Sequence, residues 1–246
     1  MNPDLVKGFA WLLLSLAPFI LVQRILHREI QIIFYALTKS QEFSLGLFSL
    51  LFFPGVLLHE LSHYLFARLV GVQTGRLSLL PKRVPGNKIV MGYVETAHAD
   101  IFRTSLIGAA PLITGCLVVA WIGNSRLILH PLIETFLSGN YPIFTETLAA
   151  VPQQPDFWVW FYLIFVISST MLPSESDRSA FLPLLATFTV LLAIILVVGL
   201  GQTILNTFST VLLQSIQALA FIFTISLMVH IVLFFPLRLI RGLLLR

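Results

Sequence analysis

The segment FPGVLLHELSHYLFAR, residues 53–68, decides the architecture, because it places two histidines and a glutamate inside an apolar run. Together with the apolar residues that precede it from Phe43, the run is long enough to cross a bilayer, which takes about 20 residues. Ionisable side chains are costly inside the hydrocarbon core and usually mark a functional site there. The sequence therefore predicts a membrane helix over about residues 43–70 with a polar site in it.

The rest of the chain has the composition of a membrane protein. Of its 246 residues, 57% are hydrophobic and 11% are charged, whereas soluble domains carry about 25% charged residues. This balance excludes an ordinary soluble enzyme and a disordered chain. The net charge of +4 does not indicate a nucleic-acid partner, because the 15 basic residues lie at the ends of apolar segments. A single cysteine, Cys116, excludes an internal disulfide and a cysteine-rich metal cluster.

Apolar segments of spanning length predict an all-α membrane protein with about six transmembrane helices. They cover about residues 5–26, 43–70, 104–123, 157–172, 181–205 and 211–235. Two strand-type runs, 76–80 and 88–94, lie among glycines and prolines after the second segment and predict a small β-hairpin or sheet. Residues 124–156 predict an outward-facing loop with a short interfacial helix.

The chain divides into three predicted parts. Residues 1–42 form an N-terminal span and interfacial segment, 43–178 form the core with the polar site, and 179–246 form two further spans and a basic tail. With six spans, 11 of the 15 basic residues fall on the side that holds both ends of the chain. The positive-inside rule then predicts both termini in the cytoplasm. The small size and the lack of a targeting signal favour a bacterial cell membrane.

His59, Glu60 and His63 form an HExxH motif, which has a direct chemical interpretation. Residues i and i+4 share one face of a helix, so both imidazoles can reach one metal ion. Zinc is the natural ion for imidazole ligands with an open fourth position, and Glu60 could act as general base on a water at that position. The alternative is a pair of helix-packing histidines with an unrelated glutamate.

Two histidines leave a catalytic zinc ion one protein ligand short. Pro173 cannot continue a helix, so the chain should unwind after the fourth predicted span and free a carboxylate to turn inward. Asp177 is the preferred third ligand of a single zinc ion per chain, with Glu175 as the alternative. In a third interpretation both acids are solvated and Asp177 pairs with Arg178.

These motifs resemble the site-2 protease family, the zinc-dependent intramembrane metalloproteases. The HExxH motif is present without change. Thr170-Met171-Leu172-Pro173 stands where the family has Asn-x-x-Pro, and Asp177 stands where the family has the aspartate of Leu-Asp-Gly. Gly108 to Leu112 resembles the small-residue segment that the family packs against its metal helix. The resemblance covers about residues 43–178 and indicates a divergent member.

The resemblance implies hydrolysis of peptide bonds in membrane-embedded proteins or peptides, with Glu60 as the catalytic base. Thr170 or Ser169 could steady the substrate or the oxyanion, or could simply bond back to their own helix. The run 88–94 could bind an unwound substrate as an added strand or be a plain hairpin.

The alternative function is an inactive, zinc-binding pseudoprotease that acts as a membrane interaction protein. His230 is interpreted as a gate or, alternatively, as a histidine that bonds to a neighbouring span. The sequence leaves the substrate and the oligomeric state open, and it predicts no nucleic-acid partner.

Overall fold

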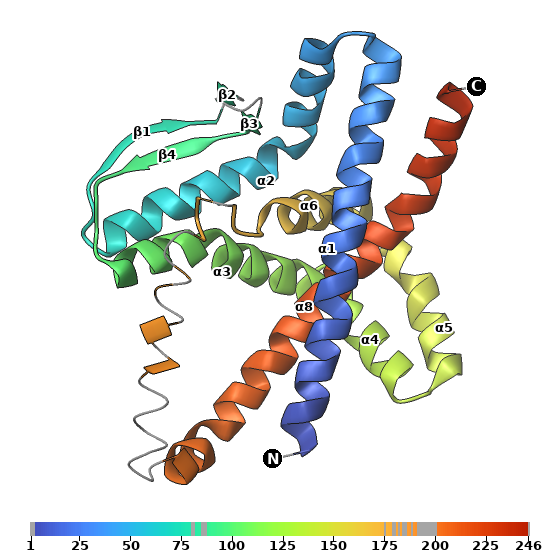
Figure 1. The fold of residues 1–246 in the computed structure, drawn as a ribbon. Coiled ribbons are helices and arrows are strands. Elements are labelled where there is room, and N and C mark those ends of the chain that lie inside the picture. Colours follow the sequence, from blue (N-terminus) through green and yellow to red (C-terminus); the bar gives the residue numbers. More distant parts are fainter. Residues whose placement is uncertain are drawn as a thin grey trace.

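The computed structural model describes residues 3–79, 82–84, 88–174, 176–178 and 201–245, with scattered positions between 181 and 190. Most of them are helical (Figure 1). The long helices are α1 (Pro3–Thr38), α2 (Gln41–Leu69), α3 (Ile101–Ser125) and α8 (Gly201–Leu244). The shorter elements are α4 (Leu129–Leu137), α5 (Tyr141–Ala150), the 3₁₀ turn η1 (Val151–Gln153) and α6 (Phe157–Thr170).

Four of the described helices are long and apolar enough to cross a membrane: α1, α2, α3 and the Phe208–Leu244 part of α8. They confirm four of the predicted apolar segments as long helices. Their length and composition are those of an integral membrane protein. The prediction of six spans is wrong for the described residues. The fourth predicted span is α6, which has 14 residues where a span needs about 20, because Asp156 and Pro173 bound it closely. The fifth, 181–205, lies mostly outside the described residues.

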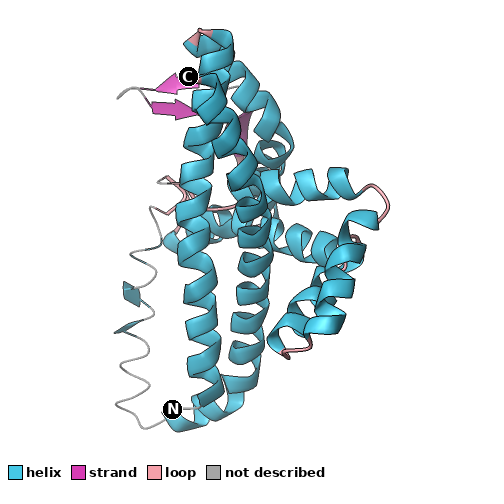
Figure 2. Ribbon diagram, turned by 90° about the vertical axis from the view of Figure 1, so that its right-hand side faces the viewer, coloured by secondary structure: helices cyan, strands magenta, loops and turns pink. Residues whose placement is uncertain are grey.

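Helices α1 and α8 run side by side in the same direction. Near the start of α1 the Trp11 Nε1–H donates to Thr224 Oγ1 (3.1 Å), and further along both helices Arg241 Nη1 donates to Glu29 Oε1 (2.7 Å). The N and C ends of the chain accordingly lie at opposite ends of the molecule (Figure 2). Parallel helices that both cross a bilayer start on one side and end on the other. The prediction that both termini share the cytoplasmic side assumed six alternating spans, and the described residues do not support it.

The predicted β-hairpin is confirmed and lies beside α2 and α3 (Figure 1). Strand β1 (Thr74–Ser78) pairs antiparallel with β4 (Tyr93–Thr96). Further out, β2 (Lys82–Val84) pairs antiparallel with β3 (Lys88–Val90). The β1–β4 ladder has a register irregularity between Thr74 and Leu77. In the predicted outward loop, α4, α5 and η1 supply more helix than the single interfacial helix expected.

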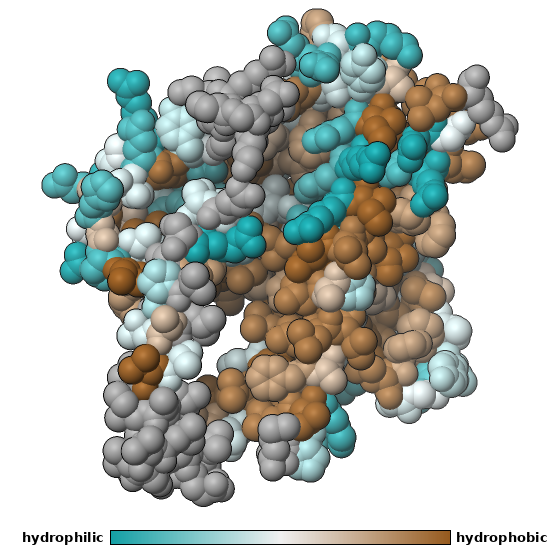
Figure 3. All heavy atoms as spheres, in the orientation of Figure 1, coloured by the Kyte–Doolittle hydropathy of each residue, from teal (hydrophilic) through white to brown (hydrophobic). Residues whose placement is uncertain are grey.

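Large apolar side chains remain exposed along the long helices. Figure 3 shows them as a hydrophobic surface over the middle of α1 and α8, with polar side chains gathered towards the C-terminal ends of both helices. Leu13, Leu14 and Leu21 of α1 are 60% or more exposed. A soluble monomer rarely exposes an apolar surface of this extent. Contact with lipid accounts for it.

Helices α2, α3 and α6 pack closely where α2 carries Pro54 and Gly55. Pro54 lies inside α2, which bends in this region (Figure 1) because proline removes a helix hydrogen bond and clashes with the preceding turn. A Cβ atom at Gly55 would overlap the Val166 carbonyl oxygen of α6. Tyr162 of α6 also donates to the Leu51 carbonyl oxygen (2.7 Å). The small residue thus allows α6 to approach the helix that carries the HExxH motif.

We expect Gly55→Ala to destabilise the fold, because the new methyl group must push α2 and α6 apart. Overpacking of this kind lowers the free energy of unfolding by about 1–3 kcal/mol. Thermal unfolding of the purified protein in detergent micelles measures the effect. Gly46→Ala is the matched control on the same helix, since a Cβ there meets nothing within 4 Å. Equal melting temperatures for the two variants would contradict the proposed close approach.

Candidate metal centre

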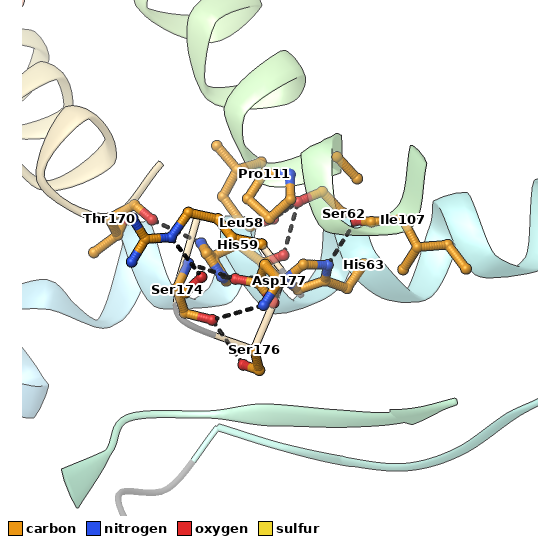
Figure 4. A network of polar contacts seen from close by, with 12 residues as sticks. Leu58, His59, Ser62, His63, Ile107, Pro111, Thr170, Ser174, Ser176 and Asp177 are labelled. Atoms are coloured by element: carbon orange, nitrogen blue, oxygen red, sulfur yellow. Dashed lines mark hydrogen bonds and ion pairs between the residues drawn. The ribbon is translucent and has the colours of Figure 1, made fainter. Parts of the chain in front are cut away.

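His59 and His63 lie on one face of α2 and turn the same ring nitrogens towards each other (Figure 4). Their Nε2 atoms are 3.2 Å apart. The Nδ1 atom of His59 lies 2.6 Å from the Thr170 carbonyl oxygen, and that of His63 lies 2.8 Å from the Ile107 carbonyl oxygen. A carbonyl oxygen only accepts hydrogen bonds, so each Nδ1 carries the proton and each Nε2 presents a lone pair. This is the arrangement of metal-binding histidines.

Asp177 completes the cluster from the loop that follows α6. Its Oδ2 lies 3.6 Å from His59 Nε2, and its Oδ1 lies 3.4 Å from His63 Nε2. The side chains of these three residues are only 10–14% exposed. The backbone N–H of Ser174 donates to Asp177 Oδ2 (2.7 Å) and holds the carboxylate in place.

The three groups could hold a metal ion. Ligand atoms about 2.1 Å from a tetrahedrally coordinated ion lie roughly 3.3–3.4 Å from one another. The two histidine Nε2 atoms are 3.2 Å apart, and each lies 3.4–3.6 Å from a different oxygen of the Asp177 carboxylate. With one ligand atom taken from each residue, the three atoms lie within 4.8 Å of one another. Two imidazole lone pairs and a carboxylate repel each other at this distance unless a proton or a metal cation lies between them. The cluster therefore fits a divalent metal ion, as the HExxH motif predicted.

The charge state of Asp177 suits this role. Burial favours the neutral acid, but hydrogen bonds from the His59 and His63 imidazoles, when these are protonated, and from the Ser174 N–H outweigh burial and hold the pKa of Asp177 well below its usual range. Arg178 is not its partner in the described contacts, because Arg178 Nε donates to the Ser174 carbonyl oxygen instead (3.2 Å). Glu175, the alternative ligand, lies outside the described residues.

Pro173 and Gly108 bring Asp177 into the site. The helix α6 ends at Thr170, three residues before Pro173, as the sequence predicts. The loop then turns back over α3, where the Asp177 carbonyl oxygen lies against Gly108 and would overlap any Cβ at that position. The resemblance implies that the segment from Gly108 packs against the metal helix; the atoms nearest to a Cβ at Gly108 belong to the ligand loop.

Glu60 lies between the metal ligands and the hairpin. It is 6% exposed. The backbone of Gly92 passes so close that a Cβ there would lie 2.8 Å from Glu60 Cγ. Glu60 and the three ligands line one cavity of about 560 Å³, which also reaches the hairpin, α1 and α6. A small molecule or an extended peptide segment fits a space of this size.

The hydroxyl of Thr170 bonds back to its own helix, which was the alternative interpretation. Thr170 Oγ1 donates to the Val166 carbonyl oxygen (2.9 Å) and is not directed at the cavity as an oxyanion donor. The functional atom of Thr170 is its carbonyl oxygen, which orients His59. The sequence offered no signal for this role, because it depends on backbone geometry between two helices.

Ser169 and His230 form a buried pair. His230 Nδ1 lies 2.7 Å from the Ser226 carbonyl oxygen and therefore carries the proton. His230 Nε2 then accepts from Ser169 Oγ (2.9 Å). The histidine thus bonds to a neighbouring helix, as the alternative interpretation held. Ser169 also lines the cavity, where its oxygen is an acceptor only and not an oxyanion donor.

Comparisons of the chain with protein-family models, with curated proteins and with solved structures returned no match.

We expect Asp177→Asn to lower metal affinity more than tenfold, because an amide is a far weaker ligand than a carboxylate for a divalent ion. Zinc content after dialysis against buffered zinc measures the loss by mass spectrometry. His59→Ala gives the reference for a missing ligand, and Glu175→Gln is the matched control in the same loop. A larger loss in Glu175→Gln than in Asp177→Asn would move the third ligand to Glu175.

Gly108→Ala should weaken metal binding without altering any ligand. The added methyl group displaces the Asp177 backbone, and the carboxylate moves with it. Misplacing a ligand through its surroundings reduces affinity about 10–100-fold. The same zinc titration detects the change, and Gly46→Ala again serves as the control. If Gly108→Ala keeps its fold by circular dichroism and binds zinc with unchanged affinity, the loop that carries Asp177 adjusts to the methyl group and the prediction is wrong.

Proposed function

We propose that this protein is an intramembrane zinc metalloprotease, similar to the site-2 proteases, that hydrolyses peptide bonds of membrane-embedded substrates. The observation that carries the proposal is the joint position of Glu60 and the cluster His59, His63 and Asp177 on one cavity. A purely structural metal site needs no carboxylate base beside its ligands. The long apolar helices supply the membrane environment.

The chain provides a defined part for each step of hydrolysis. His59, His63 and Asp177 would hold the zinc ion, which would supply a Lewis acid for the scissile carbonyl and for water. Glu60 accepts a proton from the attacking water, the C–N bond breaks, and Glu60 returns the proton to the leaving amine. The carbonyl groups of Thr170 and Ile107 keep the imidazoles oriented throughout.

Strand β4 is the proposed docking edge for the substrate. A membrane helix satisfies its own backbone groups, so it must unwind before cleavage. Residues 91–94 line the same cavity as Glu60, and within the described residues β4 and β1 form a two-stranded sheet. An extended substrate segment added to the other edge would be held by main-chain hydrogen bonds.

The distribution of basic residues indicates how α1 and α8 are oriented in the membrane. Arg24, Arg28 and Lys39 lie in the C-terminal half of α1 or just after it, and Arg238 and Arg241 lie at the same end of α8. Lys7 is the only Lys or Arg in the first 23 residues. By the positive-inside rule, the end of this helix pair that carries the C-terminus faces the cytoplasm.

Glu60→Gln tests the proposed function. The amide cannot accept the proton of water, so cleavage should fall by about 10²–10⁴-fold, while zinc content stays unchanged. Cleavage of single-span reporter proteins in liposomes is the measurement. Glu42→Gln, an exposed position in the first turn of α2, is the matched control. Unchanged turnover in Glu60→Gln would remove this residue as the base. If the zinc-loaded unmodified protein cleaves none of the reporters, the pseudoprotease alternative replaces the proposal.

A further inference from the structure

His27 of α1 is a polar group that the proposed mechanism leaves unused. Its ring lies edge-on to Phe48 (centroids 5.6 Å apart) and Phe52 (4.8 Å). Its Nε2 atom is buried and has no hydrogen-bond partner in the described part of the chain. A buried nitrogen of this kind is costly unless something satisfies it. No group among the described residues supplies that partner, so a ligand or water would satisfy the nitrogen.

The ring of His27 faces the same cavity as the metal centre. Phe48, Phe52, Val56 and His59 all line that cavity, and their spacing of three or four residues places them on one face of α2. Phe52 and His59 are seven residues apart, which is about 10 Å along a helix. His27, packed on Phe52, therefore lies roughly 10 Å along α2 from the nearest metal ligand.

A hydrogen-bond acceptor borders the cavity near His27. Gln23 precedes His27 by one turn on α1 and donates to the Ser169 carbonyl oxygen (2.5 Å), so this face of α1 packs on the end of α6. The Ser169 hydroxyl gives its proton to His230, which leaves its oxygen as an acceptor. Ser169 and His27 both line the cavity. Two polar groups thus border a region whose other walls include aromatic rings.

We propose that His27, Phe48 and Phe52 form a subsite for a substrate side chain that has an apolar body and a hydroxyl group, with tyrosine as the best match. An aromatic ring would pack against Phe48 and Phe52, and its hydroxyl would satisfy His27 Nε2. Extended chain advances about 3.3 Å per residue, so a reach of roughly 10 Å places this side chain about three residues from the scissile bond. The proposal rests on the proposed proteolytic function.

Paired substrates test the subsite. Single-span reporters carry tyrosine, or phenylalanine in its place, at each of the four positions on either side of the scissile bond. At one position about three residues away, tyrosine should raise kcat/KM at least tenfold over phenylalanine, because the missing hydroxyl leaves His27 unsatisfied. His27→Phe keeps an aromatic wall and should bring that ratio close to one. His130→Phe, which alters an exposed histidine of α4, should leave the ratio high.

Binding without turnover separates this proposal from the proteolytic one. In the Glu60→Gln background, the preferred tyrosine peptide should bind at least fivefold more tightly than its phenylalanine counterpart, as measured by fluorescence polarisation in nanodiscs. Adding His27→Phe should abolish the difference. If the Glu60→Gln variant shows this binding difference but the unmodified protein cleaves no substrate, the subsite proposal stands and the protease proposal is refuted. Cleavage with a tyrosine preference unaffected by His27→Phe, or equal binding of both peptides, would overturn the subsite.

Discussion

Two hydrogen bonds from histidine Nδ1 atoms to backbone carbonyl oxygens determine the rest of this site. His59 bonds to Thr170 at the end of α6, and His63 bonds to Ile107 in α3. Each bond fixes both the tautomer and the direction of an imidazole. The two Nε2 lone pairs converge only while α2, α3 and α6 keep their relative positions. The close contact of Gly55 with α6 and that of Gly108 with the ligand loop are therefore part of the metal centre as much as of the fold.

The sequence predicted the local parts of the site well. The i, i+4 spacing places His59 and His63 on one face of any α-helix. Pro173 ends the helix before Asp177 because its ring removes the backbone N–H that the next turn needs. Asp177 was preferred because it follows that break, and the structure brings it to within 3.6 Å of both imidazoles. These predictions depend on a few neighbouring residues, so they need no knowledge of how distant helices pack.

The sequence could not predict what depends on packing between distant segments. The parallel course of α1 and α8 follows from contacts such as that of Glu29 with Arg241, which no hydropathy pattern reveals. The carbonyl partners of the histidines belong to Ile107 and Thr170, whose side chains gave no signal. His27 lies at the end of the first predicted span, where the sequence gives no sign of a role, and its contact with Phe52 and its place on the cavity depend on packing between α1 and α2.

The short length of α6 has a consequence for the bilayer itself. Its 14 residues measure about 21 Å, some 9 Å less than a typical hydrocarbon core. The non-helical backbone that carries Asp177 follows where a full-length span would continue. Such backbone is tolerated at that depth only where it is enclosed by protein or meets water. The membrane beside α6 should therefore be locally thinned or replaced by a wet vestibule, through which a hydrolytic reaction would draw its water.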